Sequence, residues 1–410
     1  MIMTTRLLAG AAALGFVMIG WDASARAQDI AVKGAQVHTM AGPMIEDGVV
    51  VIDDGTIVAV GPAADTPVPD GFRVIEAAVV TPGLVDARTV VGLAGYLNQA
   101  QDQDQLDESA PVQPQLRAID AYNPQGVLVE WLRGFGITTI HTGHGPGALV
   151  SGQTMVAKTA GLTADDAVIR PQAMVAANLG PWALTDGSKS PGTRAKQIAL
   201  LRKALIAAQA GNEESDDGDG KSKPPSLETR VMRAVLAGER PLLVTAHRSQ
   251  DIMSALRLKE EFGIDLVLDG ASEAYLLTDA IEAAGVNVIL HPPMMRQYGE
   301  LENASFTTGA VLRDAGIPFA YQSGYEGYVP KTRVVLWEAA IAAANGLEWN
   351  EALAAITIDA ARIVGVEDRV GSLEVGKDGD VAMFDGDPFE YTSHTVGVVI
   401  DGEVVSDTPQ

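Results

Sequence analysis

The chain has no cysteine in its 410 residues. This excludes disulfide bonds, thiol nucleophiles and thiolate metal ligands, so a bound metal would have to use His, Asp, Glu or a modified Lys. Positive charge is also scarce, since 29 Lys and Arg stand against 53 Asp and Glu, for a formal net charge of −24. Phosphate backbones and anionic lipids are bound through clusters of positive charge, so we expect no nucleic-acid partner.

Long apolar runs are missing except near the start of the chain. Arg6 precedes an apolar run from Leu7 to Ile19, about 13 residues, whereas a bilayer-spanning helix needs roughly 20. Ala25-Arg26-Ala27 then has the small-x-small pattern of a cleavage site. We expect residues 1–27 to be a signal peptide cleaved after Ala27, leaving a periplasmic or secreted protein with no membrane contact. An uncleaved membrane anchor is the alternative interpretation.

Both ends of the expected mature chain alternate apolar and polar residues in short runs. Near the start, the runs 48–52 and 56–61 are separated by an Asp-Gly turn, which is typical of a β-hairpin. The same pattern returns at 379–385 and 396–405. An isolated hairpin is only marginally stable, so we predict that residues 28–80 and 369–410 form one composite β-sandwich.

Between residues 81 and 368, segments typical of strands alternate with segments typical of helices. This order favours parallel βα units, and continuous apolar strands suit a sheet covered on both faces. We predict an α/β fold with a (β/α)8 TIM-like barrel, although a doubly wound sheet has the same periodicity. The clearest expected strands are 136–140, 241–245, 265–268, 286–290 and 317–321.

Residues 211–226 interrupt this alternation with a polar, acidic stretch rich in Gly, Ser and Pro. Such a composition cannot bury enough apolar area to order itself, so we predict a disordered surface loop. A calcium-binding loop is less favoured, because the terminal Glu at the required spacing is missing.

Three blocks of sequence carry a family resemblance. The first ends in Pro82-Gly83-Leu84-Val85-Asp86-Ala87, the second includes Gly152-Gln153-Thr154 and Ala246-His247, and the third runs from Ile356 to Asp380. Together they resemble the amidohydrolase superfamily, in its secreted imidazolonepropionase-like branch. The resemblance implies an active site at the C-terminal ends of the barrel strands, with divalent ions that activate water to attack an amide or similar C–N bond.

The positions that the resemblance assigns to metal ligands hold other residues. Arg88 and Val90 replace the His-x-His pair, and neither side chain has a lone pair to donate. We align Gly270 with a later histidine and Gly324 with the Asp of the last strand. Either Thr245 or His247 falls at the fifth-strand position, so at most one inherited histidine ligand remains.

Six histidines are present, and four lie in the expected barrel. His141, His144 and His247 are the ligands we would expect if a zinc or another divalent ion does bind, with Asp86 nearby. The competing interpretations are a hydrogen-bonded loop pair for His141 and His144, and a structural residue for His247. His291, before two prolines, is interpreted as a turn residue.

Asp86 and His247 are the catalytic candidates, and Asp86 has the alternative role of holding loops by hydrogen bonds. Arg88 places a cation where the resemblance puts a metal, so it either attracts an anionic ligand or forms a salt bridge with a barrel carboxylate. Lys158 is expected to be a surface or salt-bridged lysine rather than a carboxylated bridging ligand. Tyr325 and Glu326 complete the ligand-binding candidates, with Arg88, His141 and His144.

These observations predict a periplasmic amidohydrolase-family protein that is impaired or non-catalytic, needs no cofactor, and retains a pocket for a small polar molecule. One alternative is an active C–N hydrolase with a metal site rearranged onto His141, His144 and His247. A second alternative is a scaffold subunit of a metal-intact paralogue, in a hetero-oligomer. A homo-oligomer is compatible with all three.

Overall fold

The computed structural model describes residues 29–97, 99–184, 191–210, 224–294, 296–325 and 334–410. The expected signal peptide at 1–27, Glu326, and residues 211–223 of the acidic segment lie outside this part of the chain. No helix in the described ranges is long and apolar enough to cross a membrane.

Both ends of the chain contribute strands to one seven-stranded sheet, in the order β17-β16-β15-β4-β1-β2-β3. Strand β15 pairs antiparallel with β4, and β1 pairs parallel with β4. The pairing of the two ends is therefore observed, and in a single sheet; its division into the two layers of a sandwich stays a prediction. The strands are β1 (Ile30–Val37), β2 (Ile45–Asp53), β3 (Thr56–Pro62), β4 (Arg73–Pro82), β15 (Val381–Phe384), β16 (Thr395–Ile400) and β17 (Glu403–Ser406).

The Asp-Gly turn of the first hairpin is formed as its sequence predicts. Asp54 and Gly55 have φ values of 47° and 79°, the left-handed conformation that two-residue hairpin turns require. The turn sets Asp53 opposite Thr56 and so fixes the register of β2 and β3.

The middle of the chain has a TIM-barrel-type α/β fold with mixed sheets. A six-stranded sheet has the order β14-β13-β12-β11-β10-β7, and a four-stranded sheet has the order β5-β6-β8-β9. Neighbours from β10 to β14 are parallel, as are β5 and β6, whereas β7 and β8 pair antiparallel to their neighbours. The strands are β5 (Leu84–Thr89), β6 (Ile137–Thr142), β7 (Val150–Gln153), β8 (Met155–Lys158), β9 (Val168–Arg170), β10 (Val175–Asn178), β11 (Leu242–Ala246), β12 (Leu266–Gly270), β13 (Asn287–Leu290) and β14 (Phe319–Tyr321).

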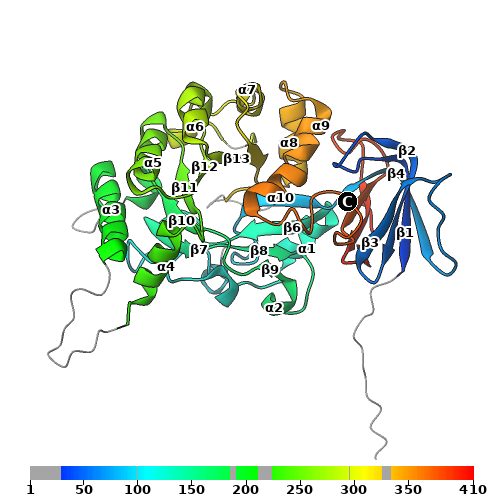
Figure 1. Ribbon diagram of the computed structural model, residues 1–410, viewed down its shortest axis with the longest axis horizontal. Coiled ribbons are helices and arrows are strands. Elements are labelled where there is room, and N and C mark those ends of the chain that lie inside the picture. Colours follow the sequence, from blue (N-terminus) through cyan, green and yellow to red (C-terminus); the bar gives the residue numbers. More distant parts are fainter. Residues whose placement is uncertain (1–28, 98, 185–190, 211–223, 295, 326–333) are drawn as a thin grey trace, which may run out of the picture.

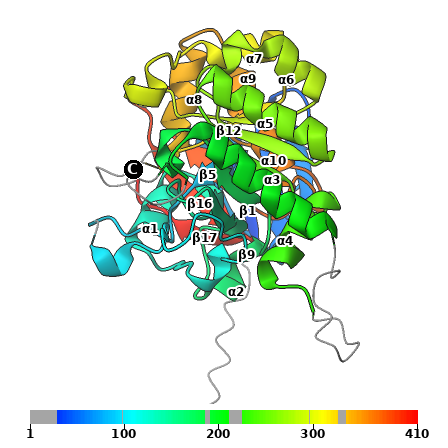
Figure 2. The same ribbon diagram turned by 90° about the vertical axis from the view of Figure 1, so that its left-hand side faces the viewer.

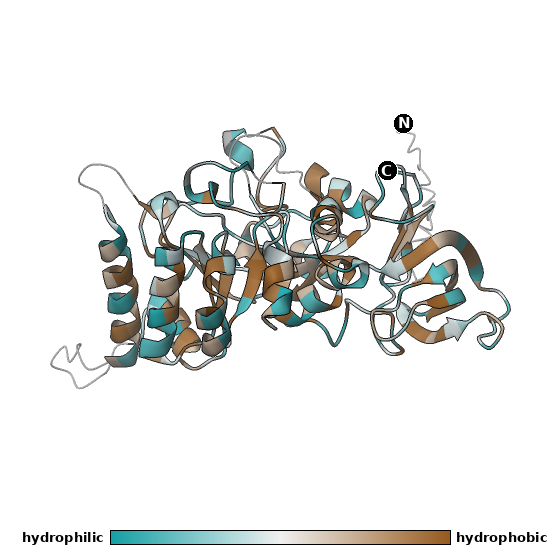
Figure 3. Ribbon diagram, turned by 90° about the horizontal axis from the view of Figure 1, so that it is seen from above, coloured by the Kyte–Doolittle hydropathy of each residue, from teal (hydrophilic) through white to brown (hydrophobic). Residues whose placement is uncertain are grey.

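Helices cover the outer side of these strands. Figures 1 and 2 show α3, α5, α6 and α7 beside β10–β13, on the side away from the seven-stranded sheet, and Figure 3 shows them banded in brown and teal. Because the helices cover one face and the barrel interior the other, strands such as β6, β11 and β12 are buried along their whole length. The helices are α1 (Val127–Gly134), α2 (Ala164–Ala167), α3 (Arg194–Ala210), α4 (Leu227–Leu236), α5 (Ser249–Phe262), α6 (Thr278–Ala284), α7 (Thr308–Asp314), α8 (Val335–Ala343), α9 (Trp349–Ala354) and α10 (Ile358–Val364).

The first and last strands of the barrel sequence meet at their C-terminal ends. Thr89 forms a parallel bridge with Gly324, whose backbone N–H donates to the carbonyl oxygen of Arg88 at 3.0 Å. This contact brings the residues after β14 beside the end of β5, where the candidate site residues lie.

Candidate functional site

Asp86 lies inside the barrel near the end of β5 and is fully buried. Its carboxylate accepts hydrogen bonds from the backbone N–H of Ser323 at 3.0 Å, from the Ser323 hydroxyl, and from the backbone N–H of Arg88 at 3.2 Å. Burial raises the pKa of Asp86 to about 6, against the opposing effect of these hydrogen bonds. Asp86 therefore joins β5 to the segment after β14, in agreement with a role in holding loops.

Arg88 is on the same side of β5 as Asp86, because side chains two residues apart share a face of a strand. The guanidinium is 1% exposed. Nη1 donates to the carbonyl oxygen of Thr89 at 2.8 Å, and Nη2 donates to the carbonyl oxygen of His144. Burial lowers the pKa of Arg88, while Asp269, Tyr325 and Asp86 act in the opposite direction.

Among the described residues, Arg88 has no carboxylate partner for the salt bridge considered from the sequence. No carboxylate in the described part of the chain lies within 4.0 Å of the guanidinium, and Asp86 and Asp269 act on it only at longer range. The backbone carbonyls take the hydrogen bonds that a carboxylate would have accepted.

Asp269, at the end of β12, is a buried carboxylate that sequence reasoning did not select. It accepts hydrogen bonds from the Thr245 hydroxyl at 2.6 Å and from the Gln322 side-chain amide at 2.6 Å. The parallel register of β11 and β12 places Thr245 directly opposite Asp269. An Asp at the end of an apolar strand was the available signal, since strand ends converge at a barrel mouth.

The register also separates Thr245 from His247, although which of them occupies the fifth-strand ligand position stays open. Thr245 belongs to β11 and faces Asp269, whereas His247 follows the end of the strand. Nδ1 of His247 lies 2.8 Å from the Ser272 hydroxyl, and Nε2 has no hydrogen-bond partner among the described residues. Burial lowers the pKa of His247 to about 3, so the ring is neutral.

Gly270 is required by the position of the His247 ring. Its φ of 79° is left-handed, and a Cβ atom there would lie 2.4 Å from Cε1 of His247. The imidazole of His247 thus fills the space that a side chain at 270 would need.

Gly324 is similarly constrained. Its φ is 71°, and a Cβ atom would lie 3.0 Å from Cγ of Pro292. The backbone N–H of Gly324 donates to the carbonyl oxygen of Arg88, and a glycine has no side chain that could bind a metal.

His141 has both ring nitrogens engaged. Nδ1 lies 2.7 Å from the carbonyl oxygen of Ala87, which can only accept, so Nδ1 carries the hydrogen. Burial lowers the pKa of His141 to about 3, so Nε2 of the neutral ring accepts from the Thr154 hydroxyl at 2.6 Å. Thr154 in turn accepts from the backbone N–H of Met174 at 3.1 Å. The lone pair of His141 is therefore already used.

His144 and His291 are also buried and neutral. Burial lowers the pKa of each to about 4. Nδ1 of His291 donates to the carbonyl oxygen of Pro292 at 3.0 Å, which leaves Nε2 as an acceptor. Nδ1 of His144 and Nε2 of His291 have no hydrogen-bond partner among the described residues.

Aromatic rings lie over the same strand ends. The half-buried Trp182, just after β10, lies with its ring centroid 5.2 Å from that of His247 and 5.6 Å from that of Tyr325. Burial raises the pKa of Tyr325 well above its ordinary value, so the phenol is protonated at neutral pH. Tyr325 therefore lies beside Trp182. Trp182 was missed because nothing in its local sequence marks it.

Lys158 is at the opposite end of the barrel. Its ammonium lies 2.6 Å from Asp380, 2.9 Å from Asp378 and 3.2 Å from Asp401. Burial alone would lower the pKa of Lys158, but these three carboxylates raise it. Of the two expected alternatives, a surface lysine or a salt-bridged one, the salt bridge is observed, and loops distant in sequence bury the side chain to 3% exposure.

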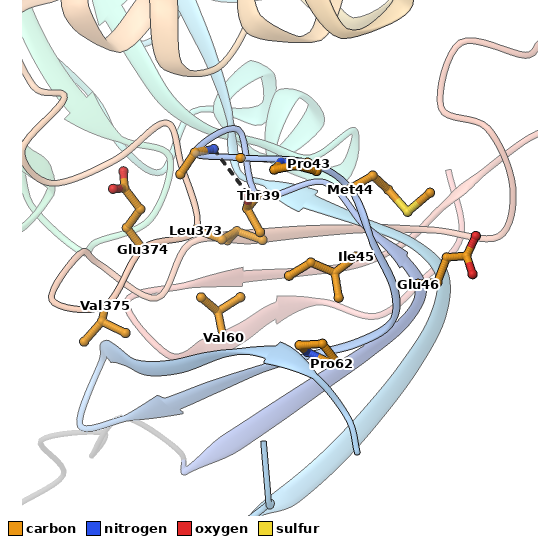
Figure 4. A pocket seen from close by; sticks show the side chains of 12 residues that line it. Thr39, Pro43, Met44, Ile45, Glu46, Val60, Pro62, Leu373, Glu374 and Val375 are labelled. Atoms are coloured by element: carbon orange, nitrogen blue, oxygen red, sulfur yellow. Dashed lines mark hydrogen bonds between the residues drawn. The ribbon is translucent and has the colours of Figure 1, made fainter. Parts of the chain in front are cut away.

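A separate cavity lies on the seven-stranded sheet, away from the barrel mouth (Figure 4). Its volume is about 700 Å³ and its walls are mainly apolar, with Glu46 and Glu374 at the edge. It contains no histidine, aspartate or hydroxyl cluster, so it offers no evident catalytic chemistry. The other labelled residues are Thr39, Pro43, Met44, Ile45, Val60, Pro62, Leu373 and Val375.

Comparison with known proteins agrees with this arrangement. The chain is 26% identical to an amidohydrolase of Thermotoga maritima, with a TM-score of 0.85 over 92% of this chain and 100% of that one. The chain belongs to the amidohydrolase superfamily. The model of the Amidohydrolase family matches residues 323–406. An imidazolonepropionase of Rhizorhabdus wittichii is 27% identical over 86% of this chain and 92% of that protein, and one of a Caulobacter species is 28% identical over 83% and 88%.

The superfamily's metal chemistry can be tested against the residues at the mouth. In the described part of the chain, no group of three or more His, Asp or Glu side chains is placed to hold a metal ion. The three-histidine site considered from the sequence is not formed, because His141 has both ring nitrogens hydrogen-bonded. Both oxygens of Asp269 are occupied as well, and Arg88 adds a positive charge. These residues do not fit a catalytic metal.

Proposed function

We propose that this protein is a metal-free, non-hydrolytic member of the amidohydrolase superfamily that uses its barrel mouth to bind a small polar molecule. The ancestral activity is the hydrolysis of C–N bonds, which the superfamily performs with metal-activated water. We further propose that the protein acts in the periplasm or outside the cell, after removal of residues 1–27.

One observation supports the proposal: at two of the positions that the resemblance assigns to metal ligands, 88 and 270, no side chain is available to a metal. Arg88 is bonded to two carbonyls, and position 270 is closed by the His247 ring. Restoring a metal site would therefore require more than one substitution. We therefore propose that the loss involves more than one ligand position.

The active-hydrolase alternative would need His141, His144 and His247 to converge on one ion. His141 would have to break its hydrogen bonds to Ala87 and Thr154 to release a nitrogen. Nothing in the described geometry favours that rearrangement, so we retain the non-hydrolytic assignment.

Metal analysis of untagged protein, expressed from the full-length sequence, tests the proposal. After incubation with zinc and removal of the excess, we expect far less than one ion per chain, and no chelator-sensitive hydrolysis of amide or cyclic C–N substrates. Stoichiometric zinc with turnover that is abolished by chelator, and by His247→Ala, would refute it. The surface variant Arg202→Met is the control for handling, because Arg202 pairs with Glu261 on the outer helices.

A further inference from the structure

A cavity of about 530 Å³ lies between the seven-stranded sheet and the start of α9. Small residues of β1 and β4 line one part of it, and His38, Trp349 and Asp387 join it from three other segments of the chain. Figure 1 shows α9 on the side of the barrel that faces this sheet. None of the described candidate residues of the barrel mouth lines this cavity, so it is a separate place in the fold.

Short side chains on the sheet leave room for a ligand in this cavity. The register of β1 and β4 sets Gln36 opposite Val79, and both residues line the space. Ala35 and Ala78 beside them carry only a methyl group each, and Gly386 has no side chain. The volume falls within the range of about 300–1,000 Å³ that is typical of small-molecule sites.

The aromatic rings of the cavity are fixed by contacts with one another. The ring centroid of Trp349 lies 4.4 Å from that of His38 and 5.2 Å from that of Phe389. Nε1 of Trp349 donates to Oδ1 of Asp387 at 2.9 Å, which sets the orientation of the indole. Burial lowers the pKa of His38, although Asp387 acts in the opposite direction, so the imidazole is neutral at neutral pH. The rings therefore offer aromatic surface without a positive charge.

Asp387 gives the same cavity a negative charge. Its Oδ1 accepts from Nε1 of Trp349 and from the backbone N–H of Phe389, both at 2.9 Å, and these two bonds leave Oδ2 unused. Among the described residues that line the cavity there is no Lys or Arg. The formal net charge of −24 adds a field that attracts cations to the whole protein. The electrostatics of the cavity therefore favour a positively charged ligand.

We propose that this cavity binds a small quaternary ammonium ion, against the rings of His38 and Trp349 and beside the carboxylate of Asp387. Aromatic rings, Trp above all, attract such cations, and the carboxylate adds a direct charge interaction. A primary ammonium would have three N–H groups to satisfy, and the lining side chains offer it two acceptors, Oδ2 of Asp387 and the amide oxygen of Gln36. A quaternary ammonium donates no hydrogen bond, so it suits this lining better. The inference goes beyond the proposed function and does not depend on it.

Calorimetric titration of the purified protein with choline tests the proposal. Two compounds of similar size separate the contributions: 3,3-dimethylbutan-1-ol has the shape of choline without its charge, and ethanolamine has a primary ammonium in place of the quaternary one. All titrations are made at the same ionic strength, with sodium chloride as the reference. We expect choline to bind at least about 10-fold more tightly than either of the other compounds.

Variants locate the binding. Asp387→Asn keeps an oxygen that accepts from Trp349 but removes the charge, so it should weaken choline binding by about 5- to 10-fold. Asp279→Asn removes the same charge from an exposed position on α6 and is the matched control, which should bind as the parent does. Trp349→Leu should weaken binding by about 10-fold. If Trp349→Leu does not fold, as judged by circular dichroism, Trp349→Phe keeps a smaller ring and should still weaken binding by about 3-fold.

The inference is overturned if choline does not bind beyond the sodium chloride reference, if 3,3-dimethylbutan-1-ol or ethanolamine binds as tightly as choline, or if Asp387→Asn binds choline as the parent does. Metal analysis of the same samples keeps the two claims apart. Absence of choline binding overturns this inference alone, whereas stoichiometric metal with chelator-sensitive turnover overturns the proposed function whatever choline does.

Discussion

Arg88 and Lys158 are buried cations at opposite ends of the barrel, and their surroundings differ. Lys158, near the seven-stranded sheet, has three carboxylates within 3.2 Å. Arg88, at the mouth, has two carbonyl partners, and its Nε has no hydrogen-bond partner in the part of the chain that the structure describes. Lys158 therefore joins the barrel to the C-terminal strands through ion pairs, whereas Arg88 is held only by neutral carbonyl groups among the described residues.

The surroundings of the two cations differ in the same sense. Around Lys158, the loops at Asp378, Asp380 and Asp401 come from the C-terminal strands and complete a closed network. Near Arg88, the neutral ring of His144 has an Nδ1 atom with no hydrogen-bond partner among the described residues. Unpaired polar groups at the mouth cost stability there, which is common where a protein binds a ligand.

The largest expected effect comes from acid, and it should act first at the mouth. Four buried histidines, at 141, 144, 247 and 291, have folded-state pKa values of about 3 to 4 against an ordinary 6.5. The folded state therefore binds fewer protons than the unfolded state, and stability is lost as the pH falls from 6.5 toward 4. At pH 5 each histidine should cost about 2 kcal/mol, for a sum on the order of 8 kcal/mol.

Urea unfolding at a series of pH values measures this loss. The unfolding free energy should fall steeply below pH 6.5, and Trp fluorescence near Trp182 should change with it. An unfolding free energy that is flat between pH 7 and pH 5 would show that the histidines are not buried as neutral rings.

Removing the cation from the Lys158 ion-pair network should have the next largest effect on the unfolding free energy. Lys158→Met should lower the unfolding free energy by about 3–5 kcal/mol, because it leaves clustered carboxylates without their cation. Lys196→Met, on the exposed face of α3, is the matched control and should stay within about 0.5 kcal/mol of the parent. Equal losses in the two variants would mean that the network contributes nothing.

A smaller effect tests the packing of His247 against Gly270. Gly270→Ala should cost about 3 kcal/mol, because the new Cβ meets the imidazole ring and the backbone is left-handed. Gly263→Ala has a similar φ of 64° with open space around it, so it should cost only about 1 kcal/mol. Denaturant unfolding compares them, and a double-mutant cycle with His247→Ala should show a coupling of at least about 1 kcal/mol. Additivity would contradict the contact.

The smallest expected effect is a contribution of Asp86 to the unfolding free energy, and it depends on pH in the opposite direction. The pKa of Asp86 is about 6 in the folded protein, above its ordinary 3.8, so its contribution is fully present below pH 3.8 and is lost as the pH rises through 6. The shift corresponds to roughly 2–3 kcal/mol. Asp86→Asn should remove this dependence, so its unfolding free energy relative to the parent should improve as the pH rises from 4 to 7. A constant difference across that range would exclude a raised pKa.

Local patterns predicted the fold well because strands and turns depend on neighbouring residues. The expected strands 136–140 and 286–290 correspond to β6 (Ile137–Thr142) and β13 (Asn287–Leu290), and the Asp-Gly hairpin formed as expected. Asp86 and Arg88 were selected from the motif that carries the family resemblance, and the structure places both in β5.

Contacts between distant residues were beyond that reasoning. Asp86 and Ser323 are 237 residues apart, and Lys158 and Asp380 are 222 apart, so neither hydrogen bond has a local pattern. The protonation of His141 depends on which groups surround it in space. The sequence alone therefore listed the right candidates without showing which of them were already engaged.

The seven-stranded sheet has a consequence for how the chain folds. Its β4 pairs with β15, so strands almost 300 residues apart must meet. Contacts so distant along the chain slow folding, because a long loop must close before they reward it. During synthesis, β4 remains an open edge until residues 381–384 have left the ribosome, and loss of the last 30 residues would leave that edge exposed to pairing with other chains.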